Sequence, residues 1–283
     1  MVRIIADSTC DLSQNLIDKY NITIIPLHIV LGDREYRDLT EIQPDEIYAW
    51  SDANKVTPKT SATSVEDTIE VMKPILDGGD DIVAFCISEQ MSTTGNVFRM
   101  VAQELEASDR VCVIDSRSLS TGIGLLVIKA AIMAGEGKSA EYIRSKITAM
   151  RDKVRASFVV DTLVYLHRGG RCSSVAAMAG SVLKLHPRIE VKDGKMDAGK
   201  KYRGSMRSVI LNYAKDMEED LRHAEKDRVF ITHSGCDEEI VRMVYSYLQS
   251  LNYFDEILTT RAGGVISSHC GYGTLGILYL AAE

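Results

Sequence analysis

The feature of this chain that most limits the folds available to it is a repeated order of strand, polar loop and helix over its first 135 residues. Residues 2–6 form a short β-rich run, and residues 81–87 form a continuous apolar run, which is typical of a parallel strand buried on both faces. A polar loop and then a helical pattern follow each run. This alternation predicts a doubly wound α/β domain around a parallel sheet.

The polar loops of this pattern are rich in hydroxyl groups. In doubly wound sheets, ligands bind at the carboxyl ends of the strands. The loops that contain Asp7, Ser61, Ser92 and Ser116 are therefore expected to gather on one rim. Hydroxyl groups donate hydrogen bonds to anions, so this rim is a candidate binding site.

The length of 283 residues exceeds the usual size of one hydrophobic core, so we expect two domains. We place an N-terminal α/β domain with a mostly parallel, Rossmann-like sheet at residues 1–155. A second α/β domain, with a mixed sheet, is expected at residues 156–283. Within it, Asp193 and Gly194 predict the tight turn of a hairpin, and a helix of small residues is expected over 175–185.

A break in the second half suggests a place for an anion. An apolar run with Asp161 and Thr162 stops at Gly169 and Gly170, and Arg171 follows at once. A glycine pair lets other groups approach the backbone closely, and a guanidinium suits a carboxylate or a phosphate. The alternative interpretation is a glycine that ends a helix, followed by a surface arginine.

Composition excludes several classes of protein. The net charge of −7 argues against nucleic acid as a partner, because phosphate backbones need a basic face. The six cysteines are scattered without metal-ligand spacing, which indicates reduced thiols and predicts a cytoplasmic protein without a metal or another cofactor. The first residues resemble a strand, not a secretory signal, and no run is long enough to span a bilayer.

Familiar catalytic motifs are absent from the sequence. It has no phosphate-binding loop with Gly-Lys-Ser/Thr, no nucleophile elbow and no dinucleotide fingerprint after the first strand. A pair such as Ser92 with His269 could in principle form a hydrolase dyad, although no acidic residue stands out to orient the histidine. His269 could also be a buried histidine without a chemical role.

Taken together, the motifs resemble those of the bacterial DegV family over essentially the whole chain. Five segments carry the resemblance, in order: residues 5–12 (Ile-Ala-Asp-Ser-Thr-Cys-Asp-Leu), 59–61 (Lys-Thr-Ser), 113–124 (Val-Ile-Asp-Ser and a later Gly-x-Gly), 161–171 (Asp-Thr-Leu and Arg-Gly-Gly-Arg) and 269–276 (His-x-Gly-x-Gly-x-x-Gly). The chain departs from the family's usual pattern at Thr93, Gly95 and Tyr272, around the expected ligand head group.

The resemblance implies a fatty-acid-binding protein of two α/β domains, with the acyl chain buried and its carboxylate at the domain interface. The residues expected to hold the carboxylate are Thr60, Ser61, Ser92, Thr94, Arg171 and His269. The loops expected to support them contain Asp7, Ser8, Ser116, Gly169, Gly170 and Gly271. A bound long-chain fatty acid is the only ligand expected.

The resemblance also implies a partner. Some family members are the binding subunit of a bacterial fatty acid kinase, which feeds phospholipid metabolism, and present the acid to a separate catalytic subunit. Arg203 matches the family position implicated in docking that subunit. We therefore expect a carrier that is not itself an enzyme and that has at most transient contact with membranes. The alternatives are a Ser92–His269 acyl hydrolase and a lipid sensor without a kinase partner.

Overall fold

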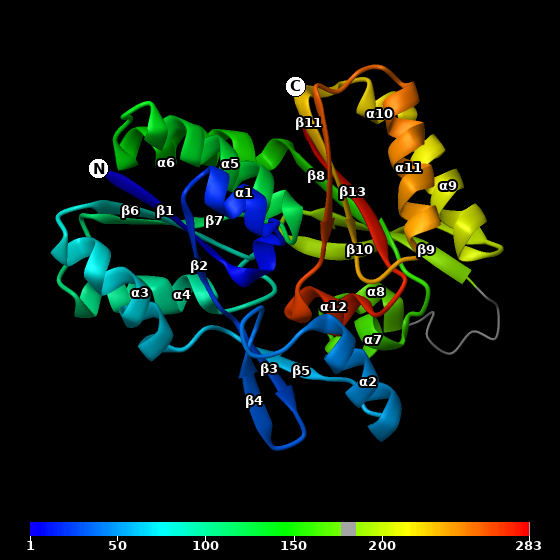
Figure 1. Ribbon diagram of the computed structural model, residues 1–283, viewed down its shortest axis with the longest axis horizontal. Helices are drawn as coiled ribbons and strands as arrows, with labels where there is room; N and C mark the ends of the chain where they lie inside the picture. The colour runs from blue at the N-terminus through cyan, green and yellow to red at the C-terminus, as the bar shows by residue number, and fades with distance from the viewer. Residues whose placement is uncertain (177–184, 283) are drawn as a thin grey trace.

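The computed structural model describes residues 1–176 and 185–282, and three β-sheets organise them (Figure 1). Of the helix expected over 175–185, the beginning is found in α8 (Ser173–Ala176), whereas residue 185 already belongs to a strand, β9 (Leu185–Lys192), so the expected end was wrong. Residues 177–184 lie outside the described part of the chain, so most of that expectation is not addressed.

The first sheet has four strands, all parallel, in the order β2 (Ile22–Ile25), β1 (Val2–Asp7), β6 (Asp81–Cys86) and β7 (Val111–Asp115). Its side chains alternate between two cores, as the period of a strand requires. Ile4 packs on the same side as the long helix α5 (Thr121–Gly135) and α6 (Ala140–Met150). Ile5 packs on the other side, with α3 (Val65–Asp77) and α4 (Thr94–Glu104). The doubly wound parallel sheet predicted from the sequence is confirmed.

The second sheet has six strands in the order β10-β9-β8-β13-β11-β12. Only β11 and β12 pair in parallel, so the sheet is mixed, as predicted. In chain order, these strands are β8 (Val154–Val159), β9 (Leu185–Lys192), β10 (Lys195–Arg203), β11 (Ala224–His233), β12 (Glu256–Arg261) and β13 (Leu275–Ala281). One face is covered by α9 (Met206–Asp216), α10 (Glu218–Leu221) and α11 (Glu238–Ser250).

Helix α5 joins the two sheets. It packs against β1 and also against β8 and β13, so it is buried between them. Its residues 123–128 are fully enclosed, which explains why the segment is apolar on all sides and lacks an amphipathic pattern. The architecture of two α/β units packed together agrees with the expected fold class. The domain boundary between residues 155 and 156 stays a prediction.

A third, antiparallel sheet was not expected. Its order is β4 (Arg34–Arg37), β3 (His28–Leu31) and β5 (Lys59–Ser61). Ile29 packs with α2 (Pro44–Asn54) and α12 (Gly264–Cys270) beneath the larger sheets. Pro26 divides the apolar run of residues 22–31, so that it supplies strands to two different sheets. The shorter elements are η1 (Ser8–Cys10), α1 (Gln14–Lys19), η2 (Arg151–Lys153) and α7 (Val164–Gly169).

Candidate functional site

A cavity of about 490 Å³ lies where the three sheets meet. Its wall combines β5, the loop after β6, the start of the segment after α7, and α12. Five of the six predicted carboxylate ligands line it, namely Thr60, Ser61, Ser92, Arg171 and His269. The cavity has the size of a small-molecule site, and Thr60 and His269, which are 209 positions apart in the sequence, meet there.

The central polar contact of the cavity joins the imidazole of His269 to the hydroxyl of Thr60, with 2.8 Å between Nε2 and Oγ1. The other ring nitrogen, Nδ1, is buried and has no hydrogen-bond partner among the described residues. A buried N–H without an acceptor costs more than a bare lone pair, so the favoured tautomer has its proton on Nε2. Thr60 then accepts that bond and keeps its own proton to donate into the cavity.

Burial, with a smaller contribution from the charge of Arg171, lowers the pKa of His269 from 6.5 to about 4. The ring is therefore neutral at pH 7 and supplies one directed N–H without a full charge. Positive charge at the site comes from Arg171 instead, which lines the cavity and donates to the carbonyl oxygen of Gly169 at 2.7 Å. The site therefore offers hydroxyl and guanidinium donors, a set that suits a carboxylate.

Gly169 makes room for the histidine ring. A Cβ atom at this position would lie 2.4 Å from Nδ1 of His269, closer than real Cβ contacts come. Gly170 then ends α7 in the left-handed conformation with φ of 68°, which favours glycine. The Gly-Gly-Arg segment thus does both things considered from the sequence, because it terminates a helix and also borders the cavity.

Two buried carboxyl groups fix α12, the helix that carries His269. Asp11 accepts from the backbone N–H of Gly263, and Asp38 accepts from that of Gly264, each at 2.8 Å. Gly264 has no space for a side chain, since an added Cβ would lie 2.8 Å from Asp38 Oδ1. These bonds satisfy donors at the start of the helix and set its position against β3.

The buried acids are shifted strongly toward their neutral forms. Burial raises the pKa of Asp11 to about 8 and that of Asp7 to about 6, and it also raises the pKa of Asp38. Hydrogen bonds from Ser120 and Ser8 partly offset this effect for Asp11 and Asp38, respectively. These carboxyl groups hold the backbone near the site, and none of them lines the cavity.

Ser92 lines the cavity, and Thr94 stands behind it. The hydroxyl groups of the two residues are 3.0 Å apart, and Thr94 is fully buried at the start of α4. Thr94 thus supports Ser92 and does not reach the cavity. Glu89 also lines the cavity, and its carboxylate pairs with Arg99. This pairing reduces the repulsion that a bound anion would meet.

The remaining predicted residues lie around the cavity or away from it. Asp7 accepts from the N–H of Ile87 at 2.7 Å, and Ser116 bonds within its own loop. Gly271 ends α12 with φ of 77°. Ser8 donates to Asp38, and Arg203 is exposed at the end of β10, outside the cavity.

Buried apolar residues, none of them recognisable from the sequence as part of a site, form the inner wall of the cavity. They are Leu27, Ile87, Met91, Leu119, Met196, Val265, Ile266 and Cys270. Three of these, Leu119, Ile266 and Cys270, also line a narrow second cavity of about 20 Å³ between α12 and the six-stranded sheet. A polar mouth thus leads to an apolar interior. In the sequence these residues look like any others in a core.

Residues 1–176 and 185–282 contain neither a metal-binding cluster nor a membrane-spanning helix. No group of three or more His, Cys, Asp or Glu side chains is arranged to hold a metal ion. No helix in this part of the chain is long and apolar enough to cross a membrane.

Comparison with known proteins gives a consistent result. A family model described as "Uncharacterised protein, DegV family" matches residues 1–282. A DegV domain-containing protein of Caldanaerobacter subterraneus is 31% identical over 280 residues, which cover 98% of each chain.

Solved structures are similar over almost the full length. A DegV family protein of Thermus thermophilus, described by its fatty acid binding, has a TM-score of 0.89 and 30% identity, and the match covers 99% of both chains. A stearic-acid-binding protein of Eubacterium ventriosum has a TM-score of 0.85 and 30% identity over 99% of this chain and 98% of that one. DegV of Bacillus subtilis, described as a fatty acid binding protein, has a TM-score of 0.84 and 25% identity, with 99% of both chains covered.

Proposed function

Because this chain belongs to the DegV family, we propose that it binds a long-chain fatty acid in the cavity between its sheets. The observation that carries the proposal is the combination of a mouth with Thr60, Arg171 and His269 and an apolar interior. The solved relatives from Thermus thermophilus and Eubacterium ventriosum, which are described as binding fatty acids, support the same ligand class.

The chemistry of the cavity matches both ends of such a ligand. A carboxylate that leaves water needs strong donors, and the Thr60 hydroxyl and the Arg171 guanidinium would supply them. Each methylene group transferred from water to the apolar interior would contribute about 0.8 kcal/mol. An acyl chain would extend past Leu119 and Ile266 toward the narrow second cavity.

The first experiment is native mass spectrometry of the purified protein, followed by organic extraction and identification of the ligand. About one fatty acid per chain would support the proposal and would identify the preferred acyl chain. A ligand-free protein that also fails to bind added fatty acids would refute it.

The Thr60→Val variant tests the head-group assignment. It keeps the shape of the β5 side chain and removes the hydroxyl, so we expect fatty acid affinity to fall about 10- to 100-fold, as for a lost hydrogen bond to a charged group. Thr259→Val, on the exposed side of strand β12, is the matched control and should bind as the wild type does. Isothermal titration with delipidated protein measures both variants.

We further propose that the chain is a carrier subunit, which presents its fatty acid in the cytoplasm to a separate kinase. Arg203 is exposed and lies outside the cavity, which fits a docking role. Arg203→Ala should impair acyl phosphate formation with a kinase subunit and leave lipid binding intact, with Arg144→Ala on α6 as the control. If lipid binding fell instead, the role given to Arg203 would be wrong. If a kinase subunit never formed acyl phosphate with the wild-type protein, a lipid sensor would be favoured.

The hydrolase alternative has less support. A Ser–His dyad needs the histidine to accept a proton from the serine, but Ser92 bonds to Thr94 and His269 bonds to Thr60. No carboxylate is hydrogen-bonded to the free ring nitrogen of His269 among the described residues. Turnover of an acyl ester that disappears in Ser92→Ala would restore this alternative.

A further inference from the structure

A separate cavity, of about 400 Å³, opens between β8 and β9, and it shares no lining residue with the proposed fatty acid cavity. The two strands pair only from Ser157–Glu190 to Val159–Arg188. Beyond Glu190, β9 stays paired with β10, while β8 stays paired with β13. The strands therefore separate into a fork, and residues 154–157 and 190–193 line its two sides.

A contact with the first half of the chain keeps the fork open. The hydroxyl of Ser88 donates to the carbonyl oxygen of Gly194 at the tip of the β9–β10 hairpin, at 2.6 Å. Met196, next to that tip, packs in the core around α5. Both contacts tie the β9–β10 turn to the first half of the chain, away from β8, so the fork is part of the packed fold.

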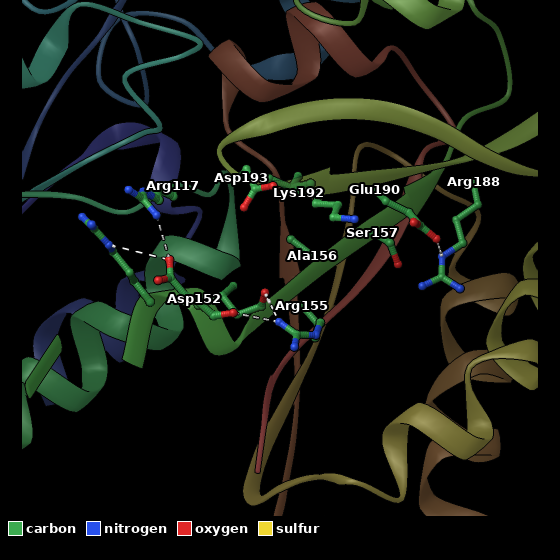
Figure 2. Close-up of a pocket in the computed structure, with 12 residues that line it drawn as sticks. Arg117, Asp152, Arg155, Ala156, Ser157, Arg188, Glu190, Lys192 and Asp193 are labelled. Atoms are coloured by element: carbon green, nitrogen blue, oxygen red, sulfur yellow. Dashed lines mark hydrogen bonds and ion pairs between the residues drawn. The ribbon is translucent and has the colours of Figure 1, made fainter. Parts of the chain in front are cut away.

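The fork concentrates positive charge in a chain whose net charge is −7. Its five cations are Arg117, Arg151, Arg155, Arg188 and Lys192, and its three acids are Asp152, Glu190 and Asp193. Figure 2 shows Arg117 and Asp152 at one end, Arg188 and Glu190 at the other, and Arg155 and Lys192 between them. An excess of two positive charges remains inside the cavity.

Several of these cations have donors to spare. Arg155 donates only to the backbone carbonyls of Asp152 and Val154, and neither Arg155 nor Lys192 has a carboxylate partner within the described part of the chain. Nε of Arg188 lies 2.9 Å from Glu190, yet it is buried without a well-directed hydrogen bond to any described residue. Its guanidinium rests on the ring of Tyr213, which fixes its position.

We propose that the fork is a binding site for a compact phosphate-bearing molecule, held by Arg155, Arg188 and Lys192. A phosphate monoester carries about −1.5 to −2 charges at pH 7, which matches the excess charge in the cavity. Its three oxygens accept hydrogen bonds from several directions, and the donors here come from different strands. A carboxylate is planar and has a single charge, so it would leave donors unused.

Isothermal titration of the full-length protein in a phosphate-free buffer at low salt tests this site. The probes are inorganic phosphate and glycerol 3-phosphate, with acetate at equal ionic strength as the comparison. We expect both phosphate probes to bind and acetate not to bind. Tighter binding of the ester would assign an organic phosphate, and equal binding would assign free phosphate, and either result supports the proposal.

Two single variants locate the binding. Arg155→Gln and Lys192→Gln change exposed side chains, and each should weaken phosphate binding about tenfold. Arg144→Gln, an exposed arginine on α6, should leave phosphate binding unchanged. Fatty acid binding and thermal unfolding, measured on the same samples, verify the fold. Acetate binding as tight as phosphate binding, or variants that bind phosphate like the wild type, would overturn the proposal.

Discussion

The replacement Gly169→Ala tests whether the position of the His269 ring controls the site. Gly169 is the last residue of α7 and has no positive φ, so alanine suits the backbone and has the higher helix propensity. The only obstacle is steric, because the new Cβ would lie 2.4 Å from Nδ1, whereas ordinary contacts begin at 3.4 Å. The ring must therefore move by about 1 Å.

A shift of this size has a calculable effect. A ring displaced by about 1 Å cannot keep its present hydrogen bond, in which Nε2 of His269 lies 2.8 Å from Oγ1 of Thr60. Thr60 would lose the group that orients its hydroxyl, and the fatty acid carboxylate would lose a directed donor. Because a hydrogen bond to a charged group contributes about 1.5–3 kcal/mol, affinity should fall about 10- to 100-fold. Overpacking should also lower the free energy of unfolding by about 1–3 kcal/mol.

The assay is titration of delipidated protein with the fatty acid found in the extract, alongside urea unfolding. Gly135→Ala is the matched control, since Gly135 is also the last residue of its helix and has open space around its Cβ position. The control should bind normally and be as stable as the wild type or slightly more stable. Wild-type affinity in Gly169→Ala would refute the role assigned to the His269 ring.

Two further predictions concern stability. The folded state lowers the pKa of His269 from 6.5 to about 4, so the contribution of the neutral ring to stability is complete above pH 6.5 and is lost as the pH falls toward 4. Relative to His269→Gln, the ligand-free wild type should lose about 3 kcal/mol of unfolding free energy across that window. Parallel curves of unfolding free energy against pH for the two proteins would contradict the assignment. The buried hydroxyl of Tyr213 donates to the carbonyl of Ser157 at 2.7 Å and accepts from the N–H of Ile277 at 3.0 Å. Tyr213→Phe should therefore lower the free energy of unfolding, measured with urea, by about 1–3 kcal/mol. Tyr142→Phe, on the surface, should leave it unchanged.

The sequence by itself determined the parallel sheet and most of the polar side of the site. Continuous apolar runs followed by polar loops and helical segments form a local pattern, and a local pattern can be recognised directly in the amino-acid sequence. The hydroxyl groups of Thr60 and Ser92, and the Gly-Gly-Arg segment that contains Arg171, could be recognised because polar residues and glycines stand out between apolar runs. A lone histidine has no pattern, so the residues alone suggested His269 only as a possible dyad partner of Ser92, and its place among the carboxylate ligands came from the family resemblance.

Only the tertiary structure decided how these residues combine. The bond between Thr60 and His269 spans 209 positions, and it depends on α12 being held by Asp11 and Asp38, which no spacing reveals. The apolar wall of the cavity could not be predicted, because Met196 and Ile266 differ from core residues only in facing a space left unfilled. The fork between β8 and β9 could not be predicted either, because the separation of the two strands depends on the contact of the β9–β10 turn with Ser88. Packing between distant segments, not local propensity, creates both the cavity beside His269 and the fork.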